Sequence, residues 1–135
     1  MSQTTGQQRI LVVDDEQDLL FMASERLRSW GHEVLTATSG EEALQIVEQQ
    51  PPDLILLDVL MPQMKGRAVC AKLKANPKTQ QIPIIFLTAL GMPDHIKEGL
   101  DLGAEDYLVK PFEPEELRDH IKVCLARHRN QCHTE

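Results

Sequence analysis

Residues 53–58 read Asp-Leu-Ile-Leu-Leu-Asp, a run of four apolar side chains closed by a carboxylate. A strand with one face in water alternates apolar and polar residues, whereas a continuous apolar run is typical of a strand covered on both faces. The segment therefore predicts a central strand of a parallel sheet that lies between two layers of helices.

Similar segments occur on both sides of this one. Residues 9–13 read Arg-Ile-Leu-Val-Val and residues 83–87 read Pro-Ile-Ile-Phe-Leu, and both predict buried strands. Further strands are predicted at residues 33–37 and 105–109. Each of the five predicted strands is followed by a segment with helical patterning.

Local signals mark the predicted helices. The first covers residues 16–30, with apolar residues on one face and Gly31 beyond its end. The second opens at Ser39, which forms a capping-box pattern with Glu42. Proline at position 114 suits the first turn of the last helix. The other two helices are predicted at residues 66–75 and, more weakly, at residues 93–102.

The repeated order of strand and helix predicts an α/β fold with right-handed crossovers. We expect a flavodoxin-like (βα)5 three-layer sandwich whose parallel five-stranded sheet has the strand order 2-1-3-4-5. One domain is expected at residues 9–128, with a flexible N-terminal segment at 1–8 and a flexible C-terminal tail at 129–135. The length of 135 residues fits a single domain.

Bulk composition excludes several classes of protein. The net charge of −7 argues against nucleic acid as a direct partner, because a binding face for phosphates needs excess positive charge. No apolar segment is long enough to span a membrane, and the polar N-terminus lacks a secretory signal. Three scattered cysteines form no zinc motif and indicate reduced thiols, so we expect a cytoplasmic protein.

Polar residues follow four of the predicted strands. They are Asp14 and Asp15 after the first strand, Asp58 after the third, Thr88 after the fourth and Lys110 after the fifth. In an open parallel sheet, ligands bind at the carboxyl ends of the strands, where the strand order reverses. The order 2-1-3-4-5 makes the first and third strands neighbours, so these five side chains are expected to share one site.

The three aspartates indicate a cation site. Carboxylates this close repel one another, and Lys110 alone does not compensate three negative charges. A hard divalent cation with oxygen ligands does so, and Mg²⁺ suits a site with few carboxylates and several waters. A carboxylate beside Mg²⁺, a hydroxyl and an ammonium group favours phosphoryl transfer onto an aspartate.

Each residue also has an ordinary structural interpretation. Asp15 could cap the first helix, Thr88 could form a turn, and Lys110 could be a solvated charge. The joint occurrence of all five residues at the correct strand ends favours the functional interpretation.

The segments that carry this pattern resemble the receiver domains of two-component response regulators. The matching stretches are 13–16 (VDDE), 57–62 (LDVLMP), 87–89 (LTA) and 103–112 (GAEDYLVKPF). The resemblance covers residues 9 to about 126. It implies a signalling switch that assists its own phosphorylation and dephosphorylation, and not an enzyme that turns over an outside substrate.

The resemblance also implies individual roles. Asp58 would be the phosphoacceptor. Asp15, Asp58 and the backbone carbonyl of Leu60 would bind Mg²⁺ directly, and Asp14 would bind it through water. Lys110 and Thr88 would hold the phosphoryl group.

Further roles concern switching and lifetime. Tyr107 would turn inward when Thr88 moves, which would change the surface formed by the fourth helix, the fifth strand and the last helix. The bond between Lys110 and Pro111 would be a cis peptide. Apolar side chains at Leu60 and Leu90 would slow loss of the phosphoryl group by hindering water.

The implied donor is a phosphohistidine on a sensor histidine kinase or a histidine phosphotransfer protein. The output partner or domain is unspecified, and a phosphorylation-dependent homodimer is compatible with the family. The alternative is a receiver-like module that binds proteins without phosphate. An aspartyl phosphatase of the haloacid dehalogenase type would need an aspartate at position 60. A flavodoxin-like cofactor module would need a Ser/Thr/Gly-rich phosphate loop after the first strand, where the acidic residues 14–16 would repel the phosphate of FMN.

Overall fold

A computed structural model describes residues 8–59, 66–89 and 103–133 of the chain. The predicted helix at 93–102 and the positions Leu60 and Leu90 lie outside these residues, as do the chain ends at 1–7 and 134–135. Among the residues that the model describes, no helix combines the length and the apolar character needed to cross a bilayer.

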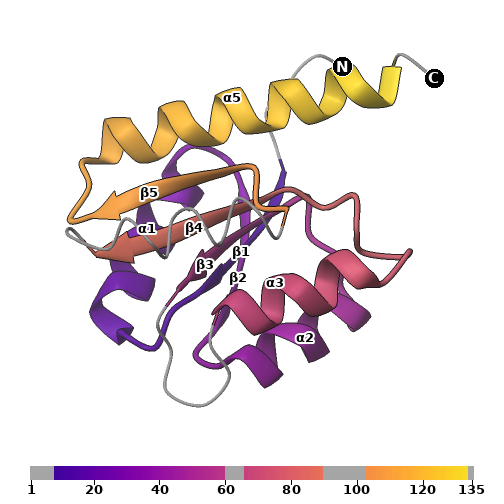
Figure 1. The fold of residues 1–135 in the computed structure, drawn as a ribbon. Helices are drawn as coiled ribbons and strands as arrows, with labels where there is room; N and C mark the ends of the chain where they lie inside the picture. The colour runs from indigo at the N-terminus through magenta and orange to yellow at the C-terminus, as the bar shows by residue number, and fades with distance from the viewer. Residues whose placement is uncertain (1–7, 60–65, 90–102, 134–135) are drawn as a thin grey trace.

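A five-stranded parallel sheet forms the middle of the molecule, with the predicted strand order β2-β1-β3-β4-β5 (Figure 1). Its strands are β1 (Arg9–Val13), β2 (Glu33–Ala37), β3 (Leu54–Asp58), β4 (Ile84–Ala89) and β5 (Asp106–Lys110). The described helices are α1 (Gln17–Ser29), α2 (Gly40–Gln49), α3 (Gly66–Ala75) and α5 (Pro114–His133). The prediction of a parallel α/β sandwich is confirmed.

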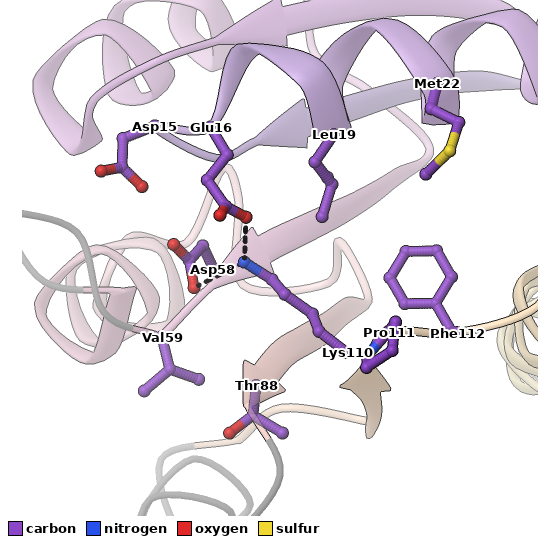
Figure 2. Close-up of a pocket in the computed structure, with 10 residues that line it drawn as sticks. All are labelled: Asp15, Glu16, Leu19, Met22, Asp58, Val59, Thr88, Lys110, Pro111 and Phe112. Atoms are coloured by element: carbon purple, nitrogen blue, oxygen red, sulfur yellow. Dashed lines mark hydrogen bonds and ion pairs between the residues drawn. The ribbon is translucent and has the colours of Figure 1, made fainter.

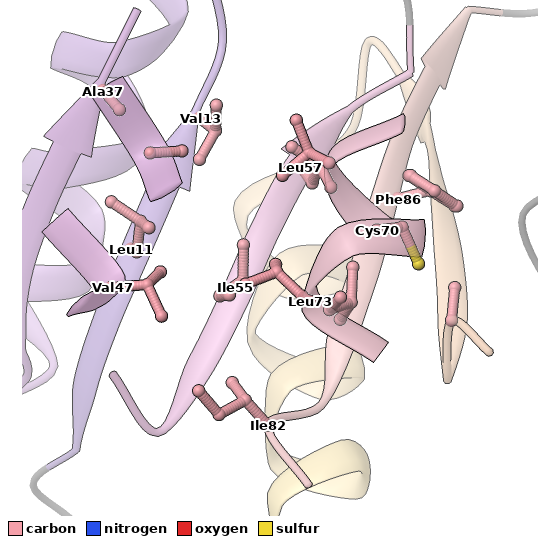
Figure 3. Packing of buried hydrophobic residues seen from close by; sticks show 14 of the residues in the cluster. Leu11, Val13, Ala37, Val47, Ile55, Leu57, Cys70, Leu73, Ile82 and Phe86 are labelled. Carbon is pink, nitrogen blue, oxygen red and sulfur yellow. The ribbon is translucent and has the colours of Figure 1, made fainter. Parts of the chain in front are cut away.

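Alternate residues of the strands enter two separate cores. Leu11 and Ile55 point to the face that α2 and α3 cover, where Val47 and Leu73 pack against them (Figure 3). On the other face, α1 and α5 pack against the intervening residues. The core on that face includes Ile10, Val12, Leu27, Leu54, Leu56, Ile121 and Cys124. Because both faces are buried, the central strands need apolar side chains at every position, as the sequence indicated.

The capping prediction at α2 is confirmed in part. The Ser39 hydroxyl accepts a hydrogen bond from the Glu42 N–H at 3.2 Å. Glu42 Oε1 reaches back to the Thr38 N–H at 2.8 Å instead of the Ser39 N–H. The contact with Ser39 satisfies a backbone donor that the first turn of a helix leaves without a partner, and the contact with Thr38 ties the residue before the N-cap to that turn.

Several boundaries differ from the sequence prediction, and Asp58 is the last residue of β3 and does not follow it. Backbone pairing continues through Thr88 and Ala89, so both lie inside β4. Lys110 is likewise the last residue of β5 and does not follow it. At the C-terminus, α5 extends to His133, so it includes residues 129–133 of the segment expected to be a flexible tail. Its sequence contains neither glycine nor proline after Pro114, so nothing in it stops the helix.

Cys124 provides a pH-dependent test of the packing between α5 and the sheet. Burial, together with the nearby Glu105 carboxylate, raises the pKa of the Cys124 thiol from 9.0 to about 12. In the unfolded chain the thiol ionises above about pH 9, while in the folded chain it stays protonated. The unfolded state therefore binds fewer protons there, and stability falls as pH rises, by at most about 1.4 kcal/mol per pH unit.

Urea unfolding between pH 8 and 10.5 checks this expectation. The wild type should lose about 1–2 kcal/mol more of its free energy of unfolding over that interval than Cys124→Ala does. Parallel pH curves for the two proteins would show that the thiol is not held in an apolar environment.

Candidate functional site

The carboxylates of Asp14, Asp15 and Asp58 meet at the carboxyl edge of the sheet. Asp14 and Asp15 follow β1, and Asp58 ends the neighbouring strand β3, which pairs with β1 through Val13 and Leu57. One ligand oxygen from each aspartate lies within 4.8 Å of the others. Asp14 and Asp58 are buried, whereas Asp15 is exposed. The sequence prediction that strand order gathers these three residues is confirmed.

The main chain fixes the position of Asp14. Its N–H donates to the Ala37 carbonyl at 3.1 Å, and its Oδ1 accepts from the Glu16 N–H at 2.9 Å. Its side chain is completely buried. A buried carboxylate is costly unless a positive charge lies next to it.

Lys110 supplies that positive charge. Its Nζ lies 2.8 Å from Asp14 Oδ2, 3.3 Å from Glu16 Oε1 and 3.5 Å from Asp58 Oδ1. Burial, the largest single influence, would lower the pKa of Lys110, but the hydrogen bond and charge of Asp14, the charge of Asp58 and the hydrogen bond of Glu16 together raise it. The lysine therefore stays charged. It pairs with Asp58, as the resemblance implied, but it lies nearer to Asp14 and Glu16.

Thr88 lies on β4, between the aspartates and the strand that carries Lys110. Its side chain is buried, and β4 pairs with β5 through Thr88 and Val109. The peptide bond between Lys110 and Pro111 is cis, the geometry that the resemblance implied. Tyr107 is different, because it is 36% exposed and does not line the cavity described below.

A cavity of about 560 Å³ opens at this edge of the sheet (Figure 2). One end is polar and holds Asp15, Asp58, Thr88 and Lys110. The other end is apolar and is lined by Leu19, Met22, Pro111 and Phe112. Val59 lies on the side of Thr88, and Glu16 lies beside Lys110. The sequence prediction did not assign Glu16, Leu19, Met22, Val59 or Phe112 to the site. Leu19 and Met22 are three positions apart, so helical periodicity places them on one face of α1, and Glu16 is the N-cap residue just before that helix.

A close backbone contact forms the floor beside Asp58. Gly66, the first residue of α3, donates its N–H to the Val59 carbonyl at 3.0 Å. A Cβ at this position would overlap the Asp58 carbonyl oxygen. Only glycine lets the start of α3 approach β3 this closely.

The donor set fits a hard divalent cation. Three carboxylates provide oxygen ligands, and Asp15 and the exposed cavity leave access for the ion and its waters. Among the residues that the structure describes, no histidine or cysteine belongs to this cluster, which disfavours zinc. Lys110 compensates part of the negative charge, and a cation would compensate the rest.

Comparisons with known proteins agree with this geometry. A family model described as "Response regulator receiver domain" matches residues 10–122. The protein named "Probable transcriptional regulator ycf27" from Cyanophora paradoxa is 49% identical over 126 residues, which are 93% of this chain and 51% of that protein. The alkaline phosphatase synthesis transcriptional regulatory protein PhoP from Bacillus subtilis is 42% identical over 119 residues, 88% of this chain and 49% of that protein.

A solved structure shows the same likeness. The chemotaxis protein CheY4 from Vibrio cholerae matches with a TM-score of 0.82 and 35% identity, over 86% of this chain and 97% of that chain. The chain spans about half the length of the two curated relatives. With the family model covering most of the sequence, the chain belongs to the response regulator receiver domain family.

Proposed function

We propose that the chain receives a phosphoryl group on Asp58 and thereby switches a signalling surface. The observation that carries the proposal is the convergence of three carboxylates, a charged lysine and a buried threonine hydroxyl at one edge of the sheet. These are the groups that phosphoryl transfer needs, namely a nucleophile, a cation site and partners for the phosphoryl oxygens. A phosphate-independent binding module would have no use for this set.

The phosphoryl donor is proposed to be a phosphohistidine of a sensor histidine kinase or a histidine phosphotransfer protein. An Asp58 carboxylate oxygen attacks the phosphorus, and the bond between phosphorus and the imidazole nitrogen breaks. The electron pair of that bond stays on the imidazole. The cavity leaves the Asp58 side accessible for such an approach.

The residues around Asp58 then hold the product. Asp15, Asp58 and the carbonyl of Leu60 would bind Mg²⁺ directly, and Asp14 through water. When bound, the ion would neutralise negative charge that gathers on the phosphoryl oxygens. The ammonium group of Lys110 would move toward those oxygens, and the Thr88 hydroxyl would donate to one of them. The chain thus assists its own phosphorylation without turning over an outside substrate.

Tyr107 is the proposed link to the surface. Its ring is partly exposed, and its N–H donates to Asp106 Oδ1 at 2.8 Å. The second oxygen of Asp106 pairs with His120 Nδ1 of α5 at 2.6 Å, so β5 and α5 are joined beside Tyr107. Inward rotation of Tyr107, after Thr88 moves, would change this face of the molecule. A kinase, an output domain or a second copy would read the change.

Intact-mass spectrometry tests the acceptor. Incubation of the chain with Mg²⁺ and acetyl phosphate should add one phosphoryl group, because Asp58 is the nucleophile beside the cation site. The gain should disappear with EDTA and in Asp58→Asn, which keeps the size of the side chain. An equal gain in Asp58→Asn would place the acceptor elsewhere, and no gain in the wild type would favour phosphate-independent binding.

Tyr107 allows a separate test of the switch, since it is the only tyrosine in the chain. With 3-fluorotyrosine incorporated, Mg²⁺ and beryllofluoride should shift the single ¹⁹F resonance, because the ring leaves its partly exposed position. Thr88→Ala should reduce the shift while Asp58 still binds the analogue. An unchanged resonance in a fully loaded wild type would contradict the proposed link.

A further inference from the structure

Glu16 competes with Asp58 for the same lysine. Glu16 Oε1 lies 3.3 Å from Lys110 Nζ, whereas Asp58 Oδ1 lies 3.5 Å from it (Figure 2). The two partners differ in exposure, since the Glu16 side chain is 62% exposed and the Asp58 side chain 8% exposed. The contact with Glu16 is therefore the outermost of the three ion pairs of Lys110.

The backbone of Glu16 is held in place although its side chain is exposed. Its N–H donates to Asp14 Oδ1 at 2.9 Å, and its carbonyl accepts from the Leu20 N–H at 3.1 Å at the start of α1. The carboxylate thus starts from a fixed point and reaches Lys110 across the mouth of the cavity. Rotation of the Glu16 carboxylate into water breaks only its exposed ion pair with Lys110, and the loss of such a pair costs little free energy.

We propose that Glu16 is a positioning residue that holds Lys110 in the resting state and must release it when Asp58 carries a phosphoryl group. The inference rests on the proposed function and adds that Glu16 controls whether Lys110 is available to the phosphoryl group. Asp14 is buried and fixed, so its contact with Lys110 can persist while the ammonium moves. The Glu16 contact cannot persist, because its carboxylate would lie next to phosphoryl oxygens of the same charge.

Affinity for beryllofluoride at saturating Mg²⁺ measures this competition in the full chain. Glu16→Gln keeps the shape of the side chain and removes its charge, so the half-saturating beryllofluoride concentration should fall about two- to fivefold, the range for an exposed ion pair. Glu16→Asp keeps the charge but is one methylene shorter, and it should behave like Glu16→Gln. Asp18→Asn removes an exposed charge from the first turn of the same helix and should behave like wild type.

Other outcomes would overturn the inference. If Glu16→Asp matches wild type while Glu16→Gln binds more tightly, charge alone acts and the contact with Lys110 has no role. If Glu16→Gln weakens binding of Mg²⁺ alone about tenfold or more, Glu16 is a cation ligand instead. If the wild type binds beryllofluoride and all variants bind it with the same affinity, Glu16 does not hold Lys110. A wild type that binds no beryllofluoride and gains no phosphoryl mass would instead overturn the proposed function, and this inference with it.

Discussion

The structure depends on one electrostatic constraint, which is that three carboxylates at the sheet edge, those of Asp14, Glu16 and Asp58, share Lys110. Asp14 is completely buried, and its charge is tolerable because Lys110 Nζ lies 2.8 Å away. Asp15 and Asp58 add negative charge to the same small volume. The negative charge at this edge exceeds the positive charge of Lys110. Binding of a cation, or of an anionic group that attracts the lysine, can therefore change which contacts the lysine makes. The site is therefore suited to switching.

The fold makes this constraint possible. Two apolar cores, one on each face, hold the strands rigidly and bring their carboxyl ends to one edge (Figures 1 and 3). Because β1 and β3 are neighbours, residues more than forty positions apart in sequence meet within a few ångströms. The close approach of Gly66 to the Asp58 backbone places the start of α3 beside the site. The apolar cores thus hold mutually repelling carboxylates close together at the edge of the sheet.

Much of this could be predicted from the sequence. Continuous apolar runs such as residues 54–57 indicated buried parallel strands, and the polar residue after each run located Asp14, Asp15 and Asp58. Periodicity does not report which oxygen a long side chain selects, so the pairing of Lys110 with Asp14 and Glu16 could not be predicted. The end of β4 could not be predicted either, because pairing with β5 extends that strand. The length of α5 could have been predicted, because no glycine or proline follows Pro114.

A crystal structure of the chain with Mg²⁺ and beryllofluoride tests most directly whether the shared lysine changes partners around a modified Asp58. We expect the analogue on an Asp58 carboxylate oxygen, with Lys110 Nζ and the Thr88 hydroxyl within hydrogen-bond distance of its fluorines and Glu16 turned away. An analogue bound elsewhere, or one bound at Asp58 while Lys110 stays with Glu16, would show that the lysine does not change partners.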